Sequence, residues 1–214
     1  MLRLLFVVFF VGISAHARAD VIAVQDFDGG SPAWSFSSDP AAGTFTSNDD
    51  DWGILGSVGN GSNTITMTNN FWGVRDIENA QNPNGDFGTL TFDSIDVSGR
   101  TGITLSFDYA VHGWDGGDDL SYQVVLNGAA QSSVLLVDGM NGGGVSRSAT
   151  ETINIANGTN TVGLILRLQQ DGGGDWGGID NVRLSGLAAI PEPSTFGLFG
   201  AICSLACFHR RRTS

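Results

Sequence analysis

Cysteine and lysine are absent from residues 20–190, and histidine occurs there once, as His112. The lack of cysteine excludes disulfides, thiol nucleophiles and the thiolate ligands of most structural zinc sites from this stretch. A serine triad would have to be built around His112, and neither a Gly-x-Ser-x-Gly elbow nor a Gly-x-x-x-x-Gly-Lys-Ser phosphate loop is present. We therefore interpret His112 as a loop or rim residue and expect a protein that is not an enzyme.

Basic residues are scarce in the same stretch. Residues 20–190 contain 21 acidic residues and five arginines, which gives a formal charge of −16. Such a surface repels polyanions, because proteins bind phosphate backbones by displacing counterions with Lys and Arg. We therefore exclude nucleic acid as a partner and expect divalent cations to be attracted.

Long stretches with a helical spacing of apolar residues are also missing, because glycine or turn clusters interrupt them. Apolar and polar residues alternate instead over residues 103–109, 120–126 and 161–168, as in half-buried strands. Shorter candidate strands are residues 21–25, 64–68, 89–92, 134–137, 152–155 and 179–184. About nine strands at short spacing predict an all-β fold, a β-sandwich, and we expect a jelly roll with adjacent first and last strands.

The amino-terminal residues 1–19 are typical of a secretory signal peptide. Arg3 precedes an apolar stretch, residues 4–13, and Ala17-Arg18-Ala19 supplies the small residues before a cleavage site. The apolar stretch is shorter than the roughly 20 residues that span a bilayer, so we favour cleavage over a retained anchor. We expect signal peptidase to release a mature protein that begins near Asp20 and contains one domain, residues 20–190.

The carboxyl-terminal residues 191–214 combine three elements in a fixed order. The first element is a proline-rich motif, Pro191-Glu192-Pro193. An apolar segment, residues 196–208, follows it, and the third element is an arginine cluster: Arg210, Arg211 and Arg212. Proline keeps the linker extended, the apolar segment can enter the bilayer as a short helix, and the arginines hold its end on the cytoplasmic side.

This tail resembles the PEP-CTERM sorting signal of Gram-negative bacteria. The resemblance implies recognition by a membrane-embedded exosortase, cleavage near the Pro-Glu-Pro motif, and release to the cell surface or an extracellular polysaccharide matrix. A permanent carboxyl-terminal membrane anchor is the alternative. The apolar segment is short for a bilayer, which favours transient membrane residence. The protein is therefore expected in the cell envelope or outside the cell.

Many of the aspartates lie in glycine-rich loops, at residues 26–28, 49–51, 115–119 and 171–175. Carboxylates and backbone carbonyls are the oxygen ligands that calcium prefers. A solvated turn is the simpler interpretation of any one of these loops. Together they make calcium the cofactor that this composition favours.

Two of the segments, residues 25–29 and 178–184, resemble the first and last strands of carbohydrate-binding-module-like jelly rolls. In that superfamily a structural calcium often joins these strands. The resemblance implies that Asp26 or Asp28, together with Asp180, supplies the side-chain ligands of a structural calcium ion.

Five tryptophans lie between residues 20 and 190, each beside a residue that favours loops. An exposed indole can stack on a sugar ring while neighbouring Asp and Asn hydrogen-bond to hydroxyl groups. Trp114 and Trp176 are our candidates for such a glycan platform. The alternative is that the tryptophans pack in the core of the sandwich.

These observations favour an exported, non-catalytic β-sandwich that binds calcium and a polysaccharide. A secreted glycan-active hydrolase or lyase is the alternative, since glycoside hydrolysis needs two carboxylates and the chain is rich in acids. The two glutamates of the domain, Glu78 and Glu151, are equally well read as solvated surface groups. A purely structural matrix protein is the third possibility.

Overall fold

The computed structural model describes residues 19–45, 51–60, 63–78, 80–139 and 144–188. These residues contain fourteen strands and no helix, so among them no helix could cross a membrane. Residues Ala19–Ala188 form one compact unit. The expected signal peptide before residue 19 and the expected sorting segment, residues 191–214, lie outside the described residues.

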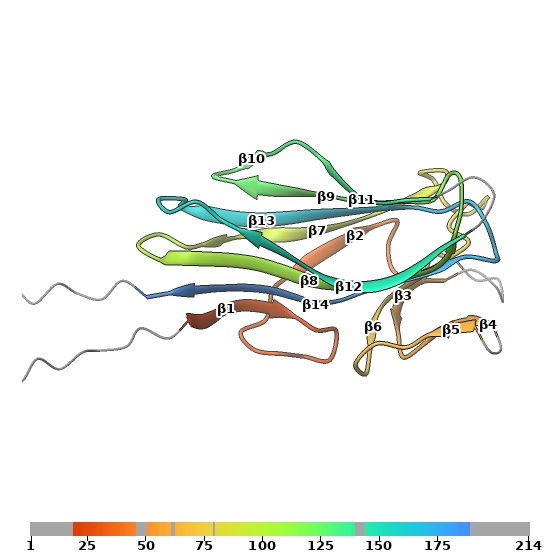
Figure 1. Ribbon diagram of the computed structural model, residues 1–214, viewed down its shortest axis with the longest axis horizontal. Coiled ribbons are helices and arrows are strands. Elements are labelled where there is room, and N and C mark those ends of the chain that lie inside the picture. The colour runs from red at the N-terminus through yellow and green to blue at the C-terminus, as the bar shows by residue number, and fades with distance from the viewer. Residues whose placement is uncertain (1–18, 46–50, 61–62, 79, 140–143, 189–214) are drawn as a thin grey trace, which may run out of the picture. The chain divides into compact units, whose positions relative to one another are not determined.

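The strands form two antiparallel sheets that face one another, together with a small ribbon (Figure 1). Sheet A has the order β12 (Val145–Asn154), β8 (Thr101–Trp114), β14 (Trp176–Leu187), β6 (Phe71–Arg75) and β3 (Asp51–Leu55), and β1 (Ala19–Gln25) also pairs with β14. Sheet B has the order β10 (Ala129–Ala130), β9 (Asp119–Leu126), β13 (Thr161–Gln169), β7 (Phe87–Asp96) and β2 (Phe36–Asp39), and β11 (Val134–Asp138) also pairs with β9. The ribbon consists of β4 (Val58–Asn60) and β5 (Asn63–Ile65). The predicted all-β sandwich is confirmed.

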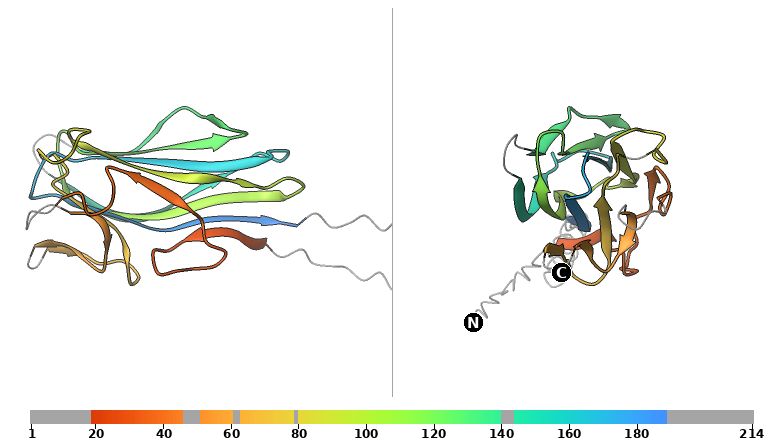
Figure 2. Two further views of the ribbon diagram at one scale, coloured as in Figure 1. Left: turned by 180° about the vertical axis from the view of Figure 1, so that it is seen from behind. Right: turned by 90° about the vertical axis from the view of Figure 1, so that its right-hand side faces the viewer.

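Strand β14 pairs with three partners. One edge pairs with β8 along most of its length, while the other pairs first with β6, as far as Ile179, and then with β1, from Val182 onward. Asp180 and Asn181 lie between these two ladders, where the register with β8 shifts. The first and last strands are therefore adjacent, as expected, and the views in Figure 2 show β1 and β14 side by side.

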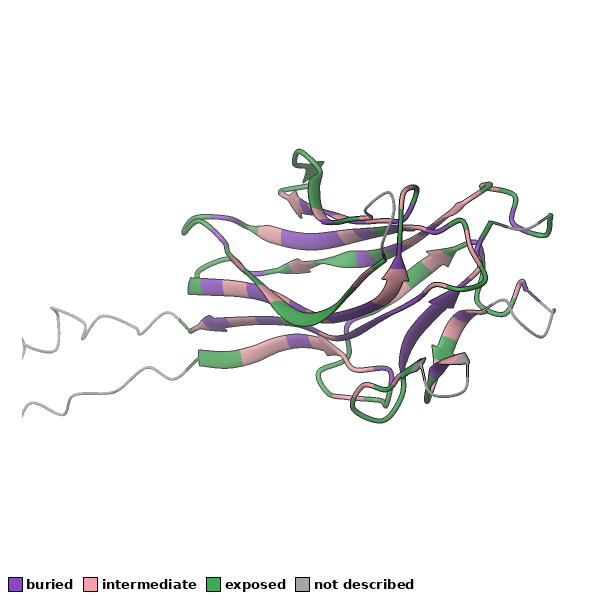
Figure 3. Ribbon diagram, turned by 45° about the vertical axis from the view of Figure 1, so that its right-hand side comes forward, coloured by how far each residue is buried: buried purple, intermediate pink, exposed green. Residues whose placement is uncertain are grey.

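The core lies between the sheets and follows the predicted alternation. In β8 the residues Ile103, Leu105, Phe107 and Tyr109 are buried, and the polar residues between them are half-buried. In β13 every second residue from position 162 to position 168 is buried in the same way, and β9 follows from position 120 to position 124. Buried and exposed segments alternate along the strands in Figure 3.

Aromatic side chains fill the end of the core beside β2, β3 and β6. Trp72 packs edge-on against Trp52, with ring centroids 5.1 Å apart, and against Phe36, at 5.6 Å. Trp34 packs on Phe92 at 5.5 Å. The indole N–H of Trp34 donates to the Asp93 carbonyl and that of Trp52 to the Pro40 carbonyl, so these buried polar groups are satisfied.

Five strands were not predicted: β2, β3, β4, β6 and β10. Strands β3 and β6 are five residues long, and each has a glycine at its centre, which weakens a pattern based on alternation. All five residues of β6 are buried, so β6 shows no alternation of burial. The strand expected at residues 64–68 is also shifted, because β5 covers Asn63–Ile65.

The contact between Gly88 and Trp52 provides a test of this packing. A Cβ atom at Gly88 would lie 2.2 Å from the Trp52 ring, which is itself held by Trp72 and the Pro40 carbonyl. We expect Gly88→Ala to destabilise the protein by about 1–3 kcal/mol, measured by denaturant unfolding. Gly56→Ala is the control, because its nearest atom would be 3.9 Å away, and we expect it to be nearly neutral. A neutral Gly88→Ala variant would contradict this packing.

Candidate functional site

A groove of about 610 Å³ lies over the outer face of sheet B. Its walls combine hydroxyl, amide, carboxylate and guanidinium groups with the apolar or aromatic side chains of Phe87, Tyr122 and Ile165. The lining residues are Asp39, Asn84, Phe87, Thr89, Ser121, Tyr122, Gln123, Ser133, Ile165 and Arg167. The volume is within the range of small-molecule binding sites, which is about 300–1,000 Å³.

The strand register explains how these side chains come to one face. Thr89 of β7 pairs with Asp39 of β2 on one side and with Arg167 of β13 on the other, and Arg167 pairs with Ser121 of β9. Directly paired residues point to the same face of a sheet. The four side chains therefore form one row across four strands, and Gln123 and Ile165 pair in the next row.

Arg167 is held in place within the groove. Its guanidinium carbon lies 3.8 Å from the centre of the Phe87 ring, a cation–π contact. A guanidinium already ordered on an aromatic face loses less rotamer freedom when it donates to a ligand. This groove was not predicted, since its residues are scattered over four strands and two loops and carry no sequence motif.

The predicted calcium ligands Asp26, Asp28 and Asp180 lie near the junction of β1, β14 and β6. Asp180 is 1% exposed, and burial raises its pKa to about 6, with the charges of Asp108, Asp28 and Asp26 adding to the increase. Asn181 opposes this rise by donating its backbone N–H to Asp180 over 2.7 Å. The three predicted ligands are therefore close enough to interact electrostatically.

Their oxygens do not, however, form a set within 4.8 Å of one another among the described residues. Asp26 accepts from Gly30 N over 2.8 Å, and Asp28 accepts from the Asn70 amide over 2.8 Å. Asp26 and Asp108 line one hollow of about 440 Å³, and Asp108 and Asp180 line a second of about 290 Å³. Calcium at these residues stays a prediction.

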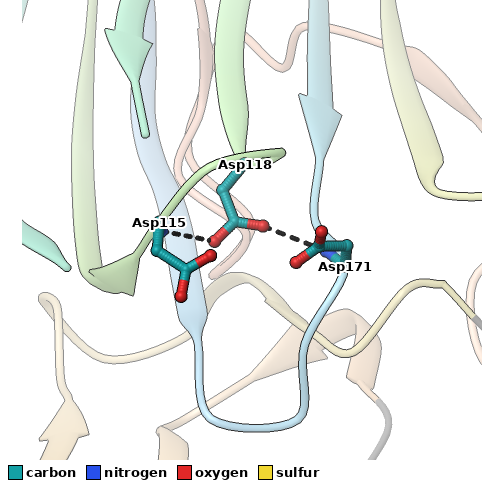
Figure 4. Close-up of side chains that lie close together, drawn as sticks. All are labelled: Asp115, Asp118 and Asp171. Carbon is teal, nitrogen blue, oxygen red and sulfur yellow. Dashed lines mark hydrogen bonds between the residues drawn. The ribbon is translucent and has the colours of Figure 1, made fainter. Parts of the chain in front are cut away.

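A different acidic cluster lies where β8, β9 and β13 end (Figure 4). Asp115 and Asp118 come from the turn between β8 and β9, and Asp171 follows β13. Each offers one carboxylate oxygen, and these oxygens lie within 4.8 Å of one another. The two loops were among the candidates drawn from the sequence, but the sequence could not show that they meet.

Asp118 is the buried member of this cluster, with 0% of its surface exposed. Its two oxygens accept the backbone N–H groups of Asp115, over 2.9 Å, and Asp171, over 3.0 Å. Burial raises the pKa of Asp118 to about 6 despite these hydrogen bonds. Burial also raises the pKa of nearby Asp175 to about 7, and the charges of the surrounding aspartates contribute, that of Asp118 most.

The structure corrects the predicted glycan platform. Trp114 is 0% exposed and Trp176 is 4% exposed, so neither presents an indole face at the surface. The Trp114 indole N–H donates to the Trp176 carbonyl over 3.1 Å, and the Trp176 ring stacks on His112 at 5.0 Å. All five tryptophans are buried, which is the packing alternative.

His112 lies within β8, two residues before its end, where it pairs with Trp176 of β14. Its Nδ1 is 3.1 Å from the Ser146 hydroxyl, which also accepts the Gly113 N–H. Among the described residues no carboxylate contacts the imidazole, so the third member of a serine triad is missing there.

Comparisons with known proteins find structural similarity without close sequence similarity. No family model matches the chain, and no curated protein matches it. TmCBM61, solved in complex with β-1,4-galactotriose, is 18% identical, and the match covers 72% of this chain and 88% of that chain with a TM-score of 0.41.

Two further solved structures match at a similar level. The K3 cleaved adhesin domain of Lys-gingipain from Porphyromonas gingivalis is 19% identical, with 78% of this chain and 99% of that chain covered and a TM-score of 0.45. The CBM22-1 xylan-binding domain of Xyn10C from Paenibacillus barcinonensis is 11% identical, with 82% and 100% covered and a TM-score of 0.41. Because these identities and TM-scores are low, they assign no function to this chain.

The raised pKa values of Asp118, Asp175 and Asp180 predict how stability depends on pH. Each carboxyl group binds its proton more tightly in the folded state than in the unfolded state, so the stability that it contributes is lost as pH rises from its ordinary pKa of 3.8 through the folded value of about 6 or 7. We expect the melting temperature in EDTA to fall as pH rises from about 5 to about 8. Differential scanning calorimetry at several pH values measures this.

Asp175→Asn serves as the matched variant, since it removes one titrating group and keeps the shape of the side chain. We expect it to reduce the slope of melting temperature against pH. The pKa values of Asp26 and Asp96 are lowered by hydrogen bonds, so these groups act at a lower pH, outside the range measured. A melting temperature that rises toward pH 8 in EDTA would show that the buried carboxylates do not control stability.

Proposed function

We propose that residues 20–190 form a non-catalytic, carbohydrate-binding β-sandwich of an exported protein, and that a neutral glycan binds in the groove on sheet B. The observation that carries the proposal is the row of polar side chains across β2, β7, β13 and β9. Hydroxyl, amide, carboxylate and guanidinium groups together supply the donors and acceptors that a polyol needs.

Charge restricts the kind of glycan. The formal charge of −16 on residues 20–190 disfavours acidic polysaccharides, because like charges repel across the whole surface. Within the groove, Arg167 offers donors and Asp39 offers acceptors in the same row. A neutral polysaccharide satisfies both groups without bringing an uncompensated charge.

The groove favours binding over hydrolysis. Glycosidases use a pair of carboxyl groups on either side of the scissile bond. Among the described residues that line the groove, Asp39 is the one carboxylate, and histidine is absent. The glycan-active enzyme considered from the sequence therefore has no acid pair in this groove.

A structural calcium ion near Asp26, Asp28 and Asp180 belongs to the same proposal. Asp180 is buried at the place where β14 changes its partner from β6 to β1, and the charges of Asp26 and Asp28 act on it. A divalent cation there would compensate the buried carboxylate and join the end of β1 to β14.

The cellular location of the protein is proposed from the sequences of its two terminal segments. Residues 1–19 supply an export signal, and the Pro191-Glu192-Pro193 motif with Arg210, Arg211 and Arg212 supplies the sorting signal. Signal peptidase and exosortase are the processing partners that these segments imply. The glycan-binding domain would then act at the cell surface or in an extracellular matrix.

Glycan binding is tested with Arg167→Ala and a panel of neutral polysaccharides. We expect the wild-type protein to bind at least one of them and Arg167→Ala to weaken that binding about tenfold, because charge-assisted hydrogen bonds are lost. Affinity gel electrophoresis and isothermal titration calorimetry measure the change.

Arg183→Ala is the matched control, since Arg183 is also exposed on a strand but belongs to sheet A. It should bind as the wild type does. Equal losses in the two variants would point to a general charge effect, and wild-type binding by Arg167→Ala would place the ligand elsewhere. If the wild-type protein bound none of the polysaccharides, a purely structural role would be favoured.

Calcium at Asp180 is tested by the increase in melting temperature between EDTA and calcium at constant ionic strength. Saturation at about 100 times the dissociation constant adds about 2.7 kcal/mol, a shift of several degrees. We expect Asp180→Asn to reduce this increase, because an amide is a weaker ligand of the same shape. Equal melting temperatures in EDTA and millimolar calcium would refute calcium binding, and an undiminished increase in Asp180→Asn would refute this position.

A further inference from the structure

The cluster of Asp115, Asp118 and Asp171 has the geometry of a cation site. Its three oxygens come from two loops that are far apart in the sequence and lie within 4.8 Å of one another (Figure 4). Calcium binds oxygens at about 2.3–2.6 Å, so ligands on opposite sides of the ion are up to about 5 Å apart. The spacing of the three oxygens is therefore compatible with one shared calcium ion.

Asp118 is held in a fixed orientation at the bottom of this cluster. The N–H groups of Asp115 and Asp171 each occupy one lone pair of its two oxygens. A carboxylate has about four such positions, so acceptor capacity remains for an ion. The two backbone hydrogen bonds thus orient the carboxylate and leave lone pairs on both oxygens available for an ion.

An independent observation comes from Gln170, which is 0% exposed. The register between β13 and β9 pairs Gln169 with Asp119, and continuing it by one position places Gln170 opposite Asp118. Gln170 and Asp118 lie one residue beyond β13 and β9, and both have the inward parity of the paired Leu168 and Leu120, so we expect their side chains on the same, inner face.

The amide oxygen of Gln170 has no hydrogen-bond partner, although it is buried. The amide nitrogen donates to the Asp175 carbonyl, so the side chain is held within the β13–β14 loop. An unsatisfied buried acceptor beside a buried carboxylate is costly, because neither group can satisfy the other. A cation is the kind of ligand that would satisfy both.

Glycines allow the carboxylates to approach. A Cβ atom at Gly117 would lie 2.5 Å from Asp171 Oδ2, and one at Gly113 would lie 2.6 Å from Asp175 Oδ1. Both glycines also have positive φ angles, +125° and +78°, which other residues rarely adopt. The turn between β8 and β9 is thus shaped to receive carboxylates from the loop after β13.

We infer that Asp115, Asp118 and Asp171, with the amide oxygen of Gln170, bind a calcium ion that joins the β8–β9 turn to the β13–β14 loop. This site is separate from the one proposed at Asp180 and does not depend on glycan binding. Its ligands are all hard oxygens, which suit calcium better than zinc or copper. Calcium also tolerates an irregular shell, whereas magnesium requires a near-ideal octahedron and keeps its water.

Terbium luminescence tests this site in the purified full chain. Terbium occupies calcium sites, and its emission rises when a nearby indole is excited; Trp114 and Trp176 directly adjoin Asp115 and Asp175. We expect sensitised emission from the wild type that calcium displaces and magnesium displaces poorly. Asp171→Asn should weaken calcium binding about tenfold or more, because one charged ligand is lost.

Two control variants accompany Asp171→Asn. Asp180→Asn distinguishes calcium at this cluster from calcium bound at Asp180, and Asp93→Asn distinguishes it from a general effect of surface charge. Asp171 is exposed, so Asp171→Asn should keep the fold, which circular dichroism in EDTA checks. Asp93→Asn removes one exposed charge elsewhere and should bind calcium as the wild type does. Wild-type affinity in Asp171→Asn, loss of the signal in Asp180→Asn alone, or equal displacement by magnesium would each overturn the inference.

Discussion

The antiparallel ladder between β8 and β14 is the interaction on which the rest of the structure depends. It joins the last strand to the longest one, and the other edge of β14 holds β6 and β1 in succession. Asp180 lies on β14 at the change of partner, and the cluster of Asp115, Asp118 and Asp171 lies in the β8–β9 turn and the β13–β14 loop. Because a strand has only two edges, β6 and β1 share one edge of β14 in succession, and the buried carboxylate of Asp180 lies between their ladders.

The distribution of aromatic residues decides which surface can bind a ligand. All five tryptophans are buried, and Trp34, Trp52 and Trp72 pack with phenylalanines between the sheets. A small, glycine-rich sandwich gains much of its core volume from such large side chains. In the groove on the outer face of sheet B, polar side chains lie beside the Phe87 ring, which contacts Arg167.

Buried carboxylates connect the stability of this protein to pH. Asp118 and Asp180 lose nearly all contact with water, and burial raises the pKa of each to about 6. The backbone N–H groups around them compensate only part of the lost hydration. Residues 20–190 contain no cysteine, so no disulfide offsets the cost of burying these two carboxylates.

The sequence by itself determined the all-β class, the three long alternating strands and the absence of cross-links. Alternation with period two is a local property, so Ile103, Leu105 and Phe107 reveal their buried face without knowledge of their partners. The parity of Asp118 with Leu120 and of Gln170 with Leu168 was present in the same pattern, as polar residues at inward positions. Only the tertiary structure decided that these residues meet, that Trp114 and Trp176 are buried, and that Asp39, Thr89 and Arg167 share a row. Those relations depend on which strands pair and in which register, and the hydrogen-bond ladders that decide this join residues far apart in the chain.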